Sequence, residues 1–215
     1  MVRVLVPRSV YEKYEKLSQY LVKFVAGFAV IDADDECMNY IKDKNIPHIV
    51  DRSAFEMHRL PIPIVKASPS EITLDQLFYL SGLDTFVENY NYPAFHLLDR
   101  PICVIDSGVD DSHEVFSRNQ VTIEKRYISR FDNGDDNVGH GTAVASIIST
   151  MCPYSKIVSI KIFDIQSPTA SISDFLESLD ISLSSNCSVV NMSLGALIPD
   201  REATLLEPSM FRLAE

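Results

Sequence analysis

Three short, mainly apolar runs in the carboxyl-terminal half constrain the fold of this chain more than any other feature. They span residues 102–105, 157–163 and 188–192, and none alternates strictly between apolar and polar side chains. Strands that are covered on both faces show this pattern. Helical patterns at 141–150 and 171–184 separate the runs. We therefore predict a parallel, doubly wound α/β sheet with its functional residues at the carboxyl ends of the strands.

The first 55 residues predict a separate small unit. Short apolar segments and charged helical segments alternate, and Ala26-Gly27 is typical of a reversal between two strands. The expected elements are a strand at 2–7, a helix at 11–17 capped by Ser9, strands on either side of Ala26-Gly27, a helix at 34–44 and a strand at 46–50. This βαββαβ order predicts a ferredoxin-like sandwich.

Residues 56–100 predict a linker and the start of the next domain. Two prolines make residues 60–64 extended, because each proline disfavours helix in the residue before it. A short helix at 74–80 and a turn at 90–93 are expected. Residues 101–215 form the third predicted region, and its last helix is expected to begin at Pro208, since proline suits the first helical position.

The composition argues against two classes of partner. The chain has 30 acidic and 19 basic residues, a formal charge of −11 that opposes binding to nucleic acids and anionic lipids. No apolar run approaches the roughly 20 residues of a membrane span, and residues 1–20 lack a secretory signal pattern. No nucleic-acid or membrane partner is therefore expected, and a cytoplasmic location is slightly favoured.

The four cysteines lack any CxxC spacing and lie in mostly apolar surroundings. We interpret them as small buried hydrophobic residues, and a disulfide between two of them stays open. They are Cys37, Cys103, Cys152 and Cys187.

Asp106 and His140 are the candidate reactive residues. Asp106 follows the first apolar run, where an aspartate alone could also simply stabilise a turn. His140 lies between Gly139 and Gly141 and opens an apolar helix; two glycines allow backbone or substrate to approach the ring closely. The segment 191–195 ends the third run and could pair with an extended peptide, or simply leave the sheet.

Together these segments resemble the motifs of the subtilisin-like serine proteases, the subtilases. Ile105-Asp106-Ser107-Gly108-Val109-Asp110 with Ser112-His113 is similar to the aspartate motif of the family. Gly139-His140-Gly141-Thr142-Ala143-Val144-Ala145 is similar to its histidine motif, and Val190-Asn191-Met192-Ser193-Leu194-Gly195 to the segment lining its substrate cleft. The segments also follow the order that the family shows.

The resemblance implies a serine endopeptidase whose partner is a polypeptide substrate. No cofactor is expected. No metal is expected either, because the stretch from His140 to Lys161 is shorter than in many secreted subtilases, which carry a calcium loop there. Asp106 would orient His140, and His140 would carry the proton between the nucleophilic serine and the leaving amine. Ser193, Leu194 and Gly195 would bind the substrate as an added strand. The family counterpart of His113 is structural, and Asn191 does not match the oxyanion asparagine.

The resemblance also implies that residues 1–55 are an intramolecular propeptide, which makes the chain part of a zymogen. The inhibitory tail is expected at 54–65, with self-cleavage between Ala54 and Lys66. No segment after Gly195 matches the oxyanion asparagine or the serine motif, so the catalytic domain at 101–215 is expected to be truncated and inactive alone. Pro168, at the second wall of the cleft, puts pairing on both sides of a substrate in doubt.

Two other interpretations stay open. The chain could be a non-catalytic protein, derived from a subtilase, that binds peptides or a partner protease. It could also be a metal-dependent hydrolase, with ligands drawn from Asp106, Asp110, Asp111, His113 and His140.

Overall fold

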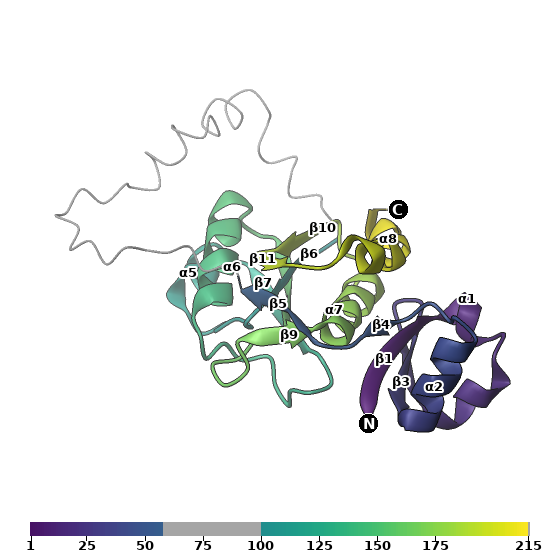
Figure 1. The fold of residues 1–215 in the computed structure, drawn as a ribbon. Helices are drawn as coiled ribbons and strands as arrows, with labels where there is room; N and C mark the ends of the chain where they lie inside the picture. Colours follow the sequence, from purple (N-terminus) through teal and green to yellow (C-terminus); the bar gives the residue numbers. More distant parts are fainter. Residues whose placement is uncertain (58–99, 215) are drawn as a thin grey trace.

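The computed structural model describes residues 1–57 and 100–214, which form three sheets (Figure 1). One is a four-stranded sheet of order β2-β3-β1-β4, one a four-stranded sheet of order β10-β6-β8-β7, and one a three-stranded sheet of order β11-β5-β9. The predicted segments at 60–64, 74–80 and 90–93 lie outside the described residues.

The central sheet is parallel, as the apolar runs predict. Its strands are β10 (Val189–Met192), β6 (Ile102–Asp106), β8 (Lys156–Lys161) and β7 (Thr122–Tyr127). Helices cover both faces: Val104 of β6 packs with residues of α5 and α6, whereas Ile105 packs on the side of α7. The mixed α/β architecture with a parallel sheet is therefore confirmed, and β7 is a strand that the sequence did not predict.

The carboxyl-terminal half also contains helices. They are α5 (Glu114–Arg118), α6 (His140–Met151), α7 (Ile172–Ser184) and α8 (Asp200–Ala214). At the start of α7, the Ser171 hydroxyl accepts from the Asp174 amide at 3.2 Å and the Asp174 carboxylate accepts from the Ser171 amide at 3.0 Å. This reciprocal pair is a capping box.

The prediction that the last helix begins at Pro208 is wrong. Helix α8 begins at Asp200 and contains Pro208 in its interior. Acidic side chains at Asp200 and Glu202 stabilise the helix start, and the buried Leu206 anchors the helix to the core. These contributions offset the one backbone hydrogen bond that proline cannot donate.

The amino-terminal sheet is antiparallel, and helical segments pack on its outer face. Its elements are β1 (Val2–Pro7), β2 (Leu21–Val25), β3 (Phe28–Ala33), α2 (Asp35–Asp43) and β4 (Ile49–Val50). The reversal at Ala26-Gly27 is present, and both residues adopt positive φ angles, of 43° and 84°. The predicted helix at 11–17 is wrong. The chain instead forms α1 (Arg8–Tyr11) and a 3₁₀ helix, η1 (Glu15–Tyr20), a break that lets Leu17 reach the core.

The inner face of the amino-terminal sheet packs against α7 and α8 (Figure 1). Leu5 and Val30 share one hydrophobic cluster with Leu179 of α7 and Leu206 of α8. Both helices also hold the turn at Ala26. Its amide donates to the Asp180 carboxylate, and its carbonyl accepts from the Ser209 hydroxyl, each at 2.6 Å. The two halves of the chain are thus joined by both apolar and polar contacts.

Candidate active site

Asp106 is the last residue of β6 and lies at the carboxyl edge of the central sheet. Its side chain is 1% exposed, and its Oδ1 accepts a hydrogen bond from the Ser107 amide at 2.7 Å. Its carbonyl accepts from the Ile162 amide at 2.8 Å, which fixes the backbone to the chain leaving β8. The carboxylate is therefore held in one place and faces away from solvent.

His140 opens helix α6 and meets this carboxylate. Its Nδ1 lies 2.8 Å from Oδ1 and 2.9 Å from Oδ2 of Asp106. Glycine is favoured on the two sides of His140 for different reasons. Gly139 has a φ of +91°, which favours glycine, and a Cβ at Gly141 would lie 2.2 Å from the Gly108 carbonyl oxygen. The structure thus brings together the two residues that the sequence proposes as reactive.

Burial raises the pKa of Asp106 above its ordinary value, although hydrogen bonds from His140 and Ser107 oppose that rise. An ionised carboxylate at this position therefore depends on its donors. The His140 side chain remains 27% exposed, so one edge of the ring is open to a reacting group.

Two of the predicted substrate-binding residues, Leu194 and Gly195, pair with an extended segment of the chain itself. Strand β5 (Ser53–Met57) lies between β11 (Leu194–Ala196) and β9 (Thr169–Ser171) and is antiparallel to both. Leu194 is opposite Met57 and Gly195 is opposite Glu56. Ser193 precedes β11, and its hydroxyl accepts from the Asn191 amide group at 3.0 Å. Leu194 and Gly195 thus present a strand edge to β5, whereas Ser193 lies outside the pairing.

Pro168, which puts pairing on both sides of a substrate in doubt, does not stop the chain's own strand β5 from pairing on both sides. Strand β9 begins at Thr169, directly after the proline, and Thr169 pairs with Glu56. The proline therefore lies outside the ladder, where its missing N–H group removes no hydrogen bond between the strands.

Side chains of β5 alternate between the core and a groove. Phe55 is 5% exposed and stacks on Phe175 of α7, with ring centroids 4.1 Å apart. Met57 is 6% exposed, whereas Glu56 points outward into an open groove lined also by Thr169 and Gly195. Apolar side chains two residues apart thus anchor this strand.

The side chains proposed as metal ligands do not converge. The ring of His113 accepts from the Val115 amide at the start of α5, and Asp110 accepts from Ser112. Asp111 pairs with Lys125. Within residues 1–57 and 100–214, no three His, Cys, Asp or Glu side chains gather where they could hold a metal ion. The metal-hydrolase hypothesis therefore finds no support in this part of the chain.

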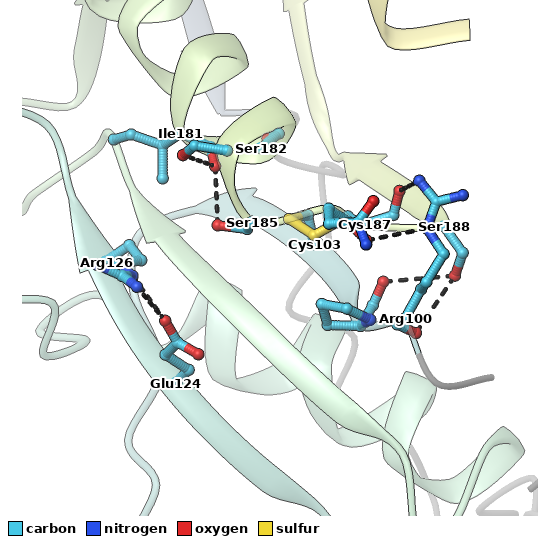
Figure 2. Close-up of a disulfide and its surroundings, with 12 residues drawn as sticks. Arg100, Cys103, Glu124, Arg126, Ile181, Ser182, Ser185, Cys187 and Ser188 are labelled. Atoms are coloured by element: carbon cyan, nitrogen blue, oxygen red, sulfur yellow. Dashed lines mark hydrogen bonds and ion pairs between the residues drawn. A yellow bond between two sulfur atoms is a disulfide. The ribbon is translucent and has the colours of Figure 1, made fainter. Parts of the chain in front are cut away.

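Two cysteines form a disulfide, which corrects the interpretation of all four as buried hydrophobic residues. Cys103 of β6 is joined to Cys187, which precedes β10 (Figure 2). Arg100 reinforces this junction, since its side chain donates to the Asn186 carbonyl at 3.1 Å and the Cys187 carbonyl at 3.3 Å. The strand that carries Asp106 is thus cross-linked to the strand that leads to the substrate-binding segment. Cys37 and Cys152 are free.

Asp136 is a residue of the site that the sequence did not single out. Burial alone would raise the pKa of Asp136, but hydrogen bonds from Thr142, Gly139 and Val138 together bring it below its ordinary value. The only signal in the sequence is an acidic residue in the loop before His140.

The lowered pKa of Asp136 predicts a loss of stability in acid. Stability from a carboxylate with a depressed folded pKa is present above the unfolded pKa and is lost as the pH falls through the folded value. We expect Asp136 to contribute to the fall in the free energy of unfolding below about pH 4. Urea titrations above and below this pH should show a smaller fall for Asp136→Asn than for the wild type. Equal falls would contradict the prediction.

Comparisons with known proteins agree with this geometry. A model of the subtilase family matches residues 100–210, more than half of the 215-residue chain. No curated protein sequence matches the chain significantly. Among solved structures, the epidermin leader peptide processing serine protease (EpiP) from Staphylococcus aureus is similar, with a TM-score of 0.64 and 16% identity. The similarity covers 100% of this chain and 57% of that one, and at this identity it shows the fold alone.

The fold and the family match together define a protease-type α/β domain. The chain belongs to the subtilase family. No helix within the described residues combines the length and apolar character that crossing a membrane requires.

Proposed function

We propose that this chain supplies the acid–base pair and the peptide-binding strands of a subtilisin-like serine endopeptidase, with the nucleophilic serine outside residues 1–215. The observation that carries the proposal is the contact of His140 Nδ1 with Asp106, 2.8 Å long, at the carboxyl edge of the central sheet. The family match supports a serine protease.

The geometry supports one direction of proton transfer. An ionised Asp106 can only accept, so Nδ1 of His140 carries the shared proton and Nε2 is the basic nitrogen. Nε2 would take the proton of the serine hydroxyl during attack and return it to the leaving amine. Asp106 would stabilise the imidazolium that forms between these steps. Among the described residues, Asp106 is the hydrogen-bond partner of the ring.

We further propose that residues 1–55 act as an inhibitory propeptide whose tail, expected at 54–65, runs through β5. The strand order β2-β3-β1-β4 supports a ferredoxin-like unit, and the contacts of Ala26 with α7 and α8 support a docked one. β5 pairs with β9 and β11 at once, as a peptide substrate of this cleft would. The chain would therefore be part of a zymogen, and self-cleavage is proposed between Ala54 and Lys66, mostly outside the described residues.

Phe55→Ala is expected to release β5 from the cleft. The substitution removes the ring that stacks on Phe175 and should weaken the strand by about 3 kcal/mol. Hydrogen exchange at the amides of residues 53–57 should then accelerate roughly 100-fold if opening is local. Glu56→Ala is the matched control, because that side chain faces the groove. Equal exchange in the two variants would contradict the anchoring role of Phe55.

Labelling with a fluorophosphonate tests the proposed activity. The probe would be added to the protein isolated from its native source, and the adduct located by peptide mass spectrometry. We expect a single labelled serine outside residues 1–215, and no label in a His140→Ala variant, because the serine needs the ring as its base. A labelled serine inside these residues would refute the assignment of the nucleophile.

One observation favours a second candidate, a non-catalytic protein that binds peptides or proteases. The cleft between β9 and β11 is filled by a strand of the chain itself, and this needs no chemistry. Under this alternative, the native protein would acquire no fluorophosphonate label in any form, yet would still bind an extended peptide once β5 is displaced.

A further inference from the structure

Asp136 lies in the loop between β7 and α6, and its half-buried carboxylate accepts five hydrogen bonds. Its Oδ1 accepts from the Ser107 hydroxyl at 2.9 Å, the Val138 amide at 2.9 Å and the Gly139 amide at 2.8 Å. Its Oδ2 accepts from the amide and the hydroxyl of Thr142, at 2.9 and 2.6 Å. The acceptor capacity of both oxygens is therefore largely used.

These donors stand on both sides of the reactive pair. Ser107 follows Asp106 directly, and Gly139 precedes His140. The Ser107 hydroxyl also accepts from the Gly141 amide at 3.0 Å, so one short network joins the end of β6 to the start of α6. Asp136 itself touches neither reactive side chain through these bonds.

Close backbone packing makes the network sensitive to small displacements. A Cβ at Gly141 would lie 2.2 Å from the Gly108 carbonyl oxygen and 3.2 Å from Asp106. A Cβ at Gly108 would lie 2.6 Å from the carbonyl oxygen of Gly134, in the loop that carries Asp136. The three segments therefore approach one another closely through their backbones.

We propose that Asp136 is a positioning residue that sets the distance between the Asp106 carboxylate and the His140 ring. It does so by binding the residue after Asp106 and the residues around His140 with one rigid group. The proposal rests on the proposed function only for the claim that catalysis uses this distance. The contact itself exists in the chain whether or not the protein is an enzyme.

Asparagine at this position keeps the shape of the side chain but not its capacity to accept hydrogen bonds with both terminal atoms. One oxygen would be replaced by an NH₂ group, which would face donors instead of acceptors. Either the Thr142 pair or the group formed by Ser107, Val138 and Gly139 would then lose its partner. Because a partly buried donor without an acceptor is costly, the loop and the helix start should separate.

Proton NMR of the full chain gives a direct readout. The proton shared by His140 Nδ1 and Asp106 should give a far-downfield resonance, assigned by its loss in His140→Gln. We expect this resonance in the wild type and its loss, or broadening by exchange with water, in Asp136→Asn at temperatures where that variant is folded. Asp135→Asn is the matched control: it alters the adjacent, exposed carboxylate that pairs with Lys125, and should keep the resonance.

An unchanged resonance in folded Asp136→Asn would overturn the proposal, since a purely structural residue would lower the stability without moving this signal. If Asp136→Asn does not fold, Ser107→Ala decides: it cuts one link of the network and should broaden the resonance, and an unaltered signal overturns the proposal. Loss of the resonance without fluorophosphonate labelling of the native protein would reject the proposed activity and keep the positioning role. Fluorophosphonate labelling of the native protein together with an unaltered resonance in Asp136→Asn would keep the proposed activity and reject the positioning role.

Discussion

Under the proposed function, Asp106→Asn is expected to lower kcat by about 10⁴-fold without lowering the stability of the fold. The asparagine oxygen can still accept from His140, but it brings no charge to stabilise the imidazolium that forms during the reaction. The stability argument follows from the raised pKa of Asp106. A raised folded pKa means that the contribution of the group is favourable below the unfolded pKa and is lost as the pH rises through the folded value. At neutral pH the buried charge is therefore a cost that asparagine removes.

Two measurements on the same variant check this prediction. Hydrolysis of a peptide substrate gives kcat, and urea unfolding at neutral pH gives the free energy of unfolding. Asp110→Asn is the control, because it alters an exposed carboxylate of the same loop. That carboxylate accepts hydrogen bonds from the amide and the hydroxyl of Ser112. The prediction fails if Asp106→Asn loses activity only in proportion to lost stability, or if Asp110→Asn loses as much.

Removal of the disulfide is expected to destabilise the protein by about 4.5 kcal/mol. Cys103 and Cys187 are 84 residues apart, and a cross-link over so long a loop strongly restricts the unfolded chain. Cys187→Ser should show this loss in urea unfolding, and dithiothreitol should reduce the stability of the wild type by a similar amount.

Cys152→Ser is the appropriate control for this experiment. Cys152 is partly exposed and free, so its replacement removes a thiol without opening a cross-link. We expect its free energy of unfolding to stay close to that of the wild type, both with and without dithiothreitol. A loss in Cys152→Ser equal to that in Cys187→Ser would contradict the structural role of the disulfide.

The central sheet could be predicted because its signal is local. A buried parallel strand needs a continuous apolar run, and β6, β8 and β10 all show one. The contact between Asp106 and His140 could also be predicted, because a residue that ends a strand and one that begins a helix in such a fold meet at one edge. Strand β7 escaped prediction because its charged side chains give no apolar run.

Features that depend on distant partners could not be predicted. Nothing in the local sequence couples Cys103 to a cysteine 84 positions away. The start of α8 was misplaced because Pro208 is a strong local signal, whereas burial of Leu206 is a tertiary effect. Likewise β5 gains both of its partners from segments more than 100 residues later, and its five residues alone do not identify a strand.

The central claim is that His140, paired with Asp106, is the base of a serine peptidase whose cleft β5 occupies. Alkylation of the His140 ring tests this claim most directly. The probe is a peptidyl chloromethyl ketone with the sequence of residues 53–57, which bonds to the ring nitrogen of a catalytic histidine as chloride leaves. In protein from the native source, we expect mass spectrometry to locate the adduct on His140 alone, and labelling to be faster in Phe55→Ala than in Glu56→Ala. Adducts on other histidines in place of His140, or equal rates in the two variants, would contradict the account.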